Sequence, residues 1–273
     1  MLSKRKLEIE RLADTFRKTS DVSTFGITNI FDLCNNSLWL GHHCYLIRYP
    51  LGASAMLGAV QYRDEDYIIF SNSSVILSRE IFTVAHEIGH IVLEHVGPNT
   101  REIHDRYLDS VDESETEANF FAACLLMPKD KLNEFIDLQF QKNSGFSTLE
   151  VAAIMSTFNV SFESAVNRLE SLGIISGEKH AELMQKKSDT TVSRMLRAIG
   201  VAPTLCAPQN IKSIPIEFLQ WVRYNYQHQL IPIETLKKAI DYLDDVSIED
   251  FDINSPVEDD AFNLEAFLEG EDE

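Results

Sequence analysis

Apolar residues recur at helical spacing in several separate stretches of the chain. In residues 4–18, Leu7, Leu12 and Phe16 would lie near one side of an amphipathic helix. The same reading predicts further helices at 29–36, 79–96, from 110 or 112 to 127, as a pair within 148–172, and at 214–227 and 233–243. Residues 177–191 are polar and are interpreted as a linker. The pattern therefore predicts a mostly helical protein.

Shorter runs predict a small three-stranded sheet. Residues 44–49 form the first expected strand, which Pro50 stops. Residues 54–62 and 67–71 are expected to form a hairpin around 63–66. An edge strand of this hairpin could bind an extended peptide through main-chain pairing. Helices and a small sheet together indicate an α+β fold.

The helix expected at residues 79–96 contains His86, Glu87 and His90 in the pattern H-E-x-x-H. Residues four apart share one helix face, so both imidazoles can point at one cation, for which zinc is the usual choice. Glu87 lies close enough to take a proton from a metal-bound water molecule, whose pKa the metal lowers to about 7. The alternative is a core helix with two hydrogen-bonded histidines.

Both ends of this helix carry boundary residues. Ser78 is a good N-cap, and Glu80 suits the positive end of the helix dipole. Gly97-Pro98 is a stop signal. Because the interior of the helix is too apolar for a surface helix, its histidines and Glu87 are expected to be buried. Buried polar groups need partners, and a metal ion would supply one.

Two histidines leave a tetrahedral zinc site short of one protein ligand. The next helix offers Glu115 and Glu117. Small residues continue the helix face of Glu115 and bulkier ones continue that of Glu117, and a close helix crossing needs small residues. Gly89 costs about 1 kcal/mol relative to Ala in a helix, which indicates close packing from the other side. We favour Glu115 as the third ligand and keep Glu117 as the alternative.

Three further residues are candidates for supporting roles. Asn119 lies one turn beyond Glu115 and could accept a hydrogen bond from the second ring nitrogen of a ligand histidine. His104 and Tyr107 lie in the polar connector between the two helices. Either of them could stabilise an oxyanion that develops on a substrate.

The H-E-x-x-H pattern is followed by E-x-E-A-N-F-x-A-x-x-L-L-M-P at residues 115–128. This arrangement resembles the ImmA/IrrE family of metallopeptidases over roughly residues 25–176. The resemblance implies a mostly helical, zincin-like core with a small sheet. It implies that His86, His90 and Glu115 bind zinc and that Glu87 is the base. It also implies a protein substrate, namely a DNA-binding repressor of the helix-turn-helix type, in a mobile-element or stress-response circuit.

These observations predict a zinc metallo-endopeptidase that cleaves a regulatory protein. The alternative is a non-proteolytic regulator that binds and sequesters a repressor, with a structural zinc ion. A cleavage product would separate the two functions. The pair of helices within 148–172 looks like a helix-turn-helix, but its second helix offers few basic residues, and we interpret it as structural packing.

Charge is unevenly distributed along the chain. The formal net charge is −19, and residues 241–273 hold fourteen acidic residues with no Lys or Arg. Direct nucleic-acid binding is therefore not expected, since phosphate contacts need a basic face. The predicted organisation is a peptidase domain at 1–176 with a helix-turn-helix-like part at about 146–176, a helical C-terminal region at 177–246, and an acidic, disordered tail at 247–273.

Composition also bears on location. No stretch of about twenty uncharged apolar residues is present, so no membrane span is expected. The N-terminal residues lack the apolar region of a secretory signal. The 4 cysteines are scattered and lack C-x-x-C spacing, which is typical of a reduced compartment. A cytoplasmic location is the expectation.

Overall fold

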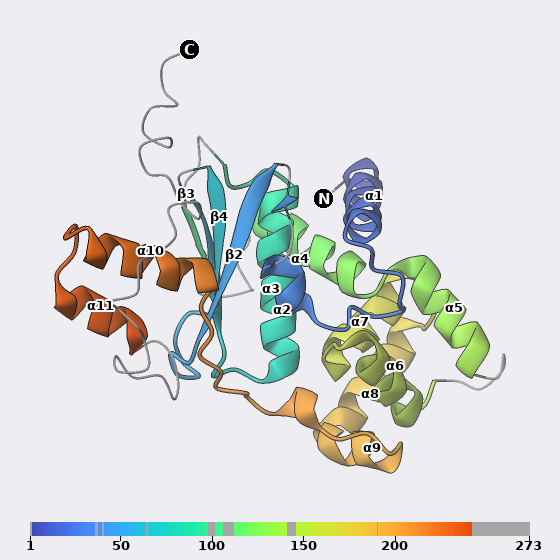
Figure 1. Ribbon diagram of the computed structural model, residues 1–273. Helices are drawn as coiled ribbons and strands as arrows, with labels where there is room; N and C mark the ends of the chain where they lie inside the picture. Colours follow the sequence, from blue (N-terminus) through green and yellow to red (C-terminus); the bar gives the residue numbers. More distant parts are fainter. Residues whose placement is uncertain are drawn as a thin grey trace. The chain divides into compact units, whose positions relative to one another are not determined.

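The structure, a computed structural model, forms two compact units, the first ending at Ile211 and the second beginning at Lys212 (Figure 1). It describes residues 2–35, 38–39, 41–63, 65–97, 102–105, 112–140, 146–189 and 191–241.

Helices dominate the first unit. They are α1 (Ser3–Thr19), α2 (Ile30–Asn35), α3 (Leu77–Val92), α4 (Glu113–Leu126), α5 (Lys129–Gln139), α6 (Thr148–Phe158), α7 (Phe162–Ser171), α8 (Gly177–Asp189), α9 (Val192–Ala198) and a 3-10 helix, Thr204–Cys206. The strands are β1 (Leu38–Trp39), β2 (His42–Tyr49), β3 (Gly58–Arg63), β4 (Asp66–Asn72) and β5 (Glu102–Asp105). The second unit contains α10 (Ile216–Gln227) and α11 (Ile233–Ile240). The α+β class predicted from the sequence is confirmed.

The strands join in the order β1-β2-β4-β3-β5. The three longer strands, β2, β3 and β4, are those expected from the sequence, with β2 parallel to β4 and β3 antiparallel to it. Strand β5, which the sequence analysis did not identify, pairs antiparallel with the other side of β3. The expectation that this hairpin provides an edge strand for peptide binding was therefore wrong, because β5 covers the outer side of β3.

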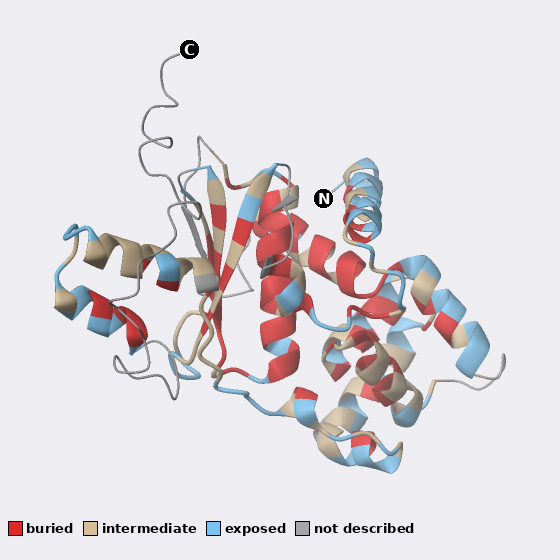
Figure 2. Ribbon diagram, viewed as in Figure 1, coloured by how far each residue is buried: buried red, intermediate tan, exposed pale blue. Residues whose placement is uncertain are grey.

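Helix α3 is the central element of the first unit. It contacts β3 and β4 on one side and α4 on another (Figure 1), and it is buried along most of its length (Figure 2). Gly58 at the start of β3 allows the sheet to approach. A Cβ atom there would lie 2.5 Å from Cγ2 of Thr83 and 3.0 Å from Oε1 of Glu87. The backbone of β3 thus lies against the part of α3 that carries Glu87.

The N-terminal boundary of α3 differs from the prediction. Ile76 is the N-cap, and Ser78 is buried inside the first turn. The backbone N–H of Leu77 donates to the carbonyl oxygen of Ala207 at 3.0 Å. A distant segment of the chain thus accepts a hydrogen bond from the first N–H of the helix, which begins before the expected cap residue. Local sequence could not indicate this contact.

The C-terminal end of α3 comes before the predicted Gly97-Pro98 stop. Glu94 adopts a left-handed conformation with φ of 58°, and the N–H of His95 donates to the carbonyl oxygen of His90 at 2.8 Å. These are features of a Schellman C-cap, in which glycine is the usual left-handed residue. Because a glutamate takes this position, the prediction placed the end too late. The turn folds His95 back onto the last turn of the helix.

Helices α6 and α7 form the pair that resembles a helix-turn-helix. Asn159 joins them in a left-handed conformation, and its Nδ2 donates to the carbonyl oxygen of Ile27 at 2.9 Å. On α7, Arg168 is buried, and its Nε donates to the carbonyl oxygen of Met127 at 3.1 Å. This guanidinium is therefore bonded within the protein interior, which agrees with the interpretation of the helix pair as structural packing.

Residues 177–189 form helix α8, so the interpretation of this segment as a linker was wrong. Leu183 is fully buried in the core of the first unit, while Glu182 pairs with Lys179 and Lys186 on the outer side. The many charged residues of α8 make its narrow apolar face difficult to recognise in the sequence. The first compact unit therefore extends to Ile211, beyond residue 176, where the peptidase domain was expected to end.

In the second unit, α10 and α11 pack around Val222, Leu236, Ala239 and Ile240. Both helices were expected from the periodicity of apolar residues. The predicted acidic tail at 247–273 lies outside the described residues.

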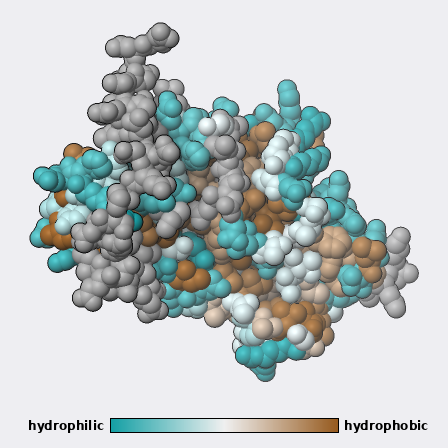
Figure 3. All heavy atoms as spheres, in the orientation of Figure 1, coloured by the Kyte–Doolittle hydropathy of each residue, from teal (hydrophilic) through white to brown (hydrophobic). Residues whose placement is uncertain are grey.

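None of the helices in the part of the chain that the structure describes is both long enough and apolar enough to cross a bilayer. Figure 3 shows hydrophilic and hydrophobic side chains interspersed over the visible face of the molecule.

Candidate metal centre

Helix α3 presents His86 and His90 on one face, one turn apart. Both side chains are fully buried, and their Nε2 atoms lie 2.9 Å from each other. The two rings meet at 76°, with centroids 4.6 Å apart. The pair thus directs two nitrogen atoms at one point, as the H-E-x-x-H spacing predicts.

Helix α4 brings a carboxylate to the same point. Asp112 caps this helix by accepting a hydrogen bond from the N–H of Ser114, which places Glu115 in the first turn. Oε2 of Glu115 lies 3.0 Å from Nε2 of His86, and Oε1 lies 3.3 Å from Nε2 of His90. One possible ligand atom from each of the three residues lies within 4.8 Å of the others.

Close approach of α3 and α4 makes this arrangement possible. A Cβ atom on Gly89 would lie 3.1 Å from Cδ1 of Phe121 and 3.2 Å from both Cα and the carbonyl oxygen of Ala118. These distances are shorter than a favourable carbon–carbon contact of about 3.5–4.0 Å. The crossing therefore uses a glycine on one helix and an alanine on the other, which confirms the packing inferred from the sequence.

The two histidines control the ionisation of Glu115. Burial by itself would raise the pKa of this carboxyl group. Hydrogen bonds to His86 and His90 outweigh the effect of burial and hold the pKa well below its usual range. Glu115 is therefore ionised at neutral pH, and its two oxygen atoms bring negative charge to the buried histidine pair.

Asn119 on α4 holds the second ring nitrogen of His86. Its Oδ1 lies 3.0 Å from Nδ1 of His86. An amide oxygen accepts hydrogen bonds, so Nδ1 of His86 carries a proton, and with a metal ion bound the Nε2 lone pair would face that ion. Partners of this kind fix the tautomer and orientation of a ligand histidine. Asn119 lies where the sequence analysis placed it.

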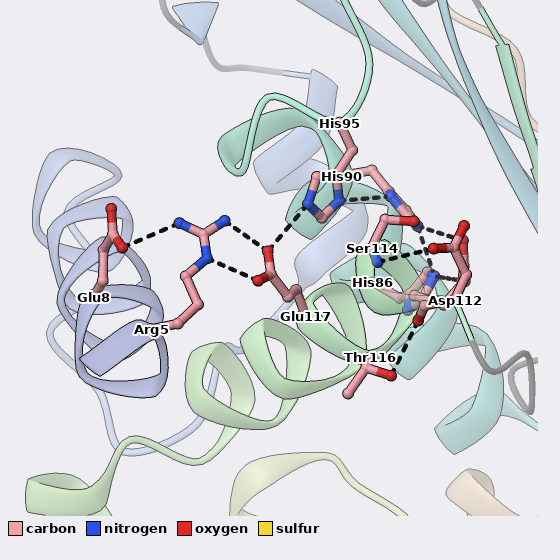
Figure 4. Close-up of polar contacts among 10 residues, drawn as sticks. Arg5, Glu8, His86, His90, His95, Asp112, Ser114, Thr116 and Glu117 are labelled. Atoms are coloured by element: carbon pink, nitrogen blue, oxygen red, sulfur yellow. Dashed lines mark hydrogen bonds and ion pairs between the residues drawn. The ribbon is translucent and has the colours of Figure 1, made fainter. Parts of the chain in front are cut away.

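His90 has a partner that the sequence analysis missed. Nδ1 of His95 lies 3.1 Å from Nδ1 of His90, and Nε2 of His95 lies 3.4 Å from Oε2 of Glu117 (Figure 4). Burial lowers the pKa of His95, and the neighbouring His90 lowers it further, which favours the neutral ring. The sequence shows a third histidine after the motif, but its contact with His90 depends on the left-handed turn at Glu94.

Glu117, the alternative third ligand, belongs to a separate ion pair. Nε and Nη2 of Arg5, on α1, donate to its two carboxylate oxygens at 2.8 and 2.6 Å (Figure 4). Arg5 lowers the pKa of Glu117, against the opposing effect of burial. In the described part of the chain, the group of side chains that could hold a metal ion includes Glu115 and not Glu117.

Three remaining candidates differ in what the structure shows of them. Glu87 follows His86 directly and is fully buried, with Oε1 facing the start of β3. The backbone of His104 pairs with Ala59 in the β3–β5 ladder, but its side chain is outside the described part of the structure. Tyr107 lies outside the described residues. The proposed oxyanion roles of His104 and Tyr107 stay predictions.

The donor set fits a divalent metal ion. Two imidazole nitrogens and one carboxylate oxygen are typical ligands of catalytic zinc centres, which keep a fourth position open for water or substrate. The Nδ1 atoms of His86 and His90 already contact Asn119 and His95, so the Nε2 atoms are those that face a shared ion. The residues present are therefore suited to holding a metal ion between α3 and α4.

Comparison with known proteins agrees with this geometry. Residues 42–170 match the family model described as the IrrE N-terminal-like domain, a peptidase family. This match and the similarity to IrrE proteins support membership of the ImmA/IrrE family. His86, His90 and Glu115 all lie within the matched residues, whereas α1 precedes them. The resemblance seen in the sequence motifs is confirmed.

Several curated proteins are similar to parts of the chain. An uncharacterized immunity region protein 2 of Bacillus phage phi105 is 29% identical over 151 residues, 55% of this chain and 81% of that protein. The radiation response metalloprotease IrrE of Deinococcus deserti is 36% identical over 77 residues, 28% of this chain and 27% of that protein. IrrE of Deinococcus radiodurans is 37% identical over 75 residues, 27% and 23% of the respective chains. The aligned regions thus span about a quarter of the two IrrE proteins.

The helix crossing at Gly89 can be tested by replacing this residue with alanine. Alanine is favoured over glycine in a helix by about 1 kcal/mol, but overpacking a core typically costs about 1–3 kcal/mol. We expect Gly89→Ala to lower the free energy of unfolding by about 1 kcal/mol, measured by urea denaturation of the metal-free protein. Gly97→Ala is the control, since a Cβ there meets nothing within 4 Å. A more stable Gly89→Ala protein would show that α3 and α4 do not meet closely there.

Proposed function

We propose that the protein is a zinc-dependent endopeptidase. The convergence of His86, His90 and Glu115 at one buried point is the observation that carries this proposal. Glu87 lies next to this point in the chain, as a metallopeptidase base must. Membership of a peptidase family supports the same reaction class.

The proposed roles follow from the chemistry of each side chain. His86 and His90 would bind the ion through Nε2, and Glu115 would bind it through its carboxylate. Glu87 would accept a proton from the attacking water at its carboxylate and deliver it to the nitrogen of the leaving amine. Asn119 would hold the ring of His86 in the tautomer that leaves Nε2 unprotonated. His104 and Tyr107 are proposed to donate hydrogen bonds to the developing oxyanion.

Zinc is the proposed metal because the donor set is two imidazoles and one carboxylate, without thiolates. When bound, zinc would polarise the scissile carbonyl group and make a water molecule acidic enough to lose a proton near neutral pH.

The proposed substrate is a regulatory protein, specifically a DNA-binding repressor of the helix-turn-helix type in a mobile-element or stress-response circuit. The name of the phage relative, an immunity region protein, supports this choice. Electrostatics also support it, since a formal net charge of −19 favours encounter with a basic DNA-binding protein.

Zinc content tests the assignment of the third ligand. We expect wild-type protein to retain about one zinc ion per chain after dialysis and Glu115→Ala to retain almost none, because two histidines alone hold zinc weakly. Glu113→Ala is the matched control, since Glu113 is an exposed residue on the same helix turn. Metal content is read by plasma mass spectrometry. Loss of zinc in Glu117→Ala but not in Glu115→Ala would reverse the assignment.

Cleavage tests the proposed activity. Zinc-loaded wild type and Glu87→Gln are each incubated with the helix-turn-helix repressor encoded next to the gene, and the products are measured by intact mass. We expect discrete fragments from wild type and about 10²–10⁴-fold slower cleavage by Glu87→Gln despite full zinc content, because the variant lacks the proton acceptor. A stable complex without fragments from either protein would instead identify a regulator that sequesters the repressor.

A further inference from the structure

The two histidines of the proposed metal site are supported in different ways. His86 is held by Asn119, which comes from the same helix as Glu115. His90 is held by His95, which in turn contacts Glu117. The series of contacts that begins at His90 extends beyond α3 and α4. It continues to Arg5 on α1 (Figure 4), before the residues matched by the family model.

The protons in this series can be placed from the acceptors. The carboxylate of Glu117 only accepts hydrogen bonds, so Nε2 of His95 must carry the proton directed at it. Nδ1 of His95 faces Nδ1 of His90 at 3.1 Å. A His90 that binds the metal ion through Nε2 carries its ring proton on Nδ1 and donates it to Nδ1 of His95.

Arg5 fixes the end of this series. Its guanidinium binds both oxygens of Glu117, at 2.8 and 2.6 Å, and a bidentate pair of this kind sets the orientation of the carboxylate as well as its charge. The side chain of Glu117 is 8% exposed, whereas that of Arg5 is 31% exposed. The ion pair thus lies between the interior and solvent, and α1 also packs along α4.

Taking the metal site proposed above as given, we infer that Arg5 is a positioning residue for His90 and that α1 is part of the metal centre. Arg5 orients Glu117, Glu117 orients His95, and His95 fixes the tautomer and ring orientation of His90. Partners of this kind typically change metal affinity by about 10–100-fold. Docking of α1 on α4 therefore sets how tightly the protein holds its ion.

Zinc affinity of the full chain, measured by competition with a chromophoric chelator, tests this role. We expect Arg5→Met to weaken zinc binding by about tenfold, the lower end of the effects of such partners. Arg5→Lys should recover part of the loss, because it keeps the charge without the bidentate geometry. Arg11→Met is the matched control, since Arg11 is an exposed arginine on the same helix. The zinc affinity of this variant should equal that of wild type.

A double-mutant cycle with His95→Phe separates positioning of His90 from general destabilisation. His95→Phe interrupts the series but leaves the Arg5–Glu117 pair in place, so Arg5→Met should have little further effect on zinc affinity in this background. The visible spectrum of the cobalt-substituted protein should change in Arg5→Met and in His95→Phe, and not in Arg11→Met. If Arg5→Met does not fold, Arg5→Lys is compared with wild type in both backgrounds.

Failure of the proposed function and failure of the role of Arg5 give different results. Wild-type protein that binds no zinc would overturn the proposed function and the role of Arg5 together. Wild-type protein that binds zinc with the same affinity as both Arg5 variants would overturn the role of Arg5 alone. Equal losses from Arg5→Met with and without His95 would also overturn it, because α1 would then act on the site by another route.

Discussion

The close contact between α3 and α4 at Gly89 is the constraint on which the rest of the site depends. A carboxylate is short, and Glu115 reaches the two histidines because nothing larger than a hydrogen atom separates Gly89 from Ala118 and Phe121. Any side chain on Gly89 would press against Ala118 and Phe121 of α4. Glycine is unfavourable within a helix, and this close contact explains why it occupies position 89.

Burial makes this arrangement demanding. His86, Glu87 and His90 are fully buried on one helix, and Glu115 is nearly so. Burying polar and charged groups is unfavourable unless they are paired. Each histidine has a polar partner at both ring nitrogens. Glu115 lies against the two Nε2 atoms, and Asn119 and His95 lie against the Nδ1 atoms. A bound cation would complete the pairing.

The sequence predicted those parts of the site that depend on one or two helices. Helical spacing placed the two histidines of α3 on one face, and the small residues beside Glu115 favoured it over Glu117. Strand β5, His95 and Arg5 were missed because their contacts depend on how distant segments return. His95 reaches its partner only through a left-handed turn at a glutamate, and Arg5 acts across more than a hundred residues of sequence.

Anomalous diffraction from crystals of the zinc-loaded protein, collected above and below the zinc absorption edge, tests the central claim most directly. The account predicts one zinc peak per chain, bound by Nε2 of His86, Nε2 of His90 and a carboxylate oxygen of Glu115, at about 2.0–2.2 Å from each. A peak elsewhere, or a zinc ion bound by Glu117 in place of Glu115, would contradict it.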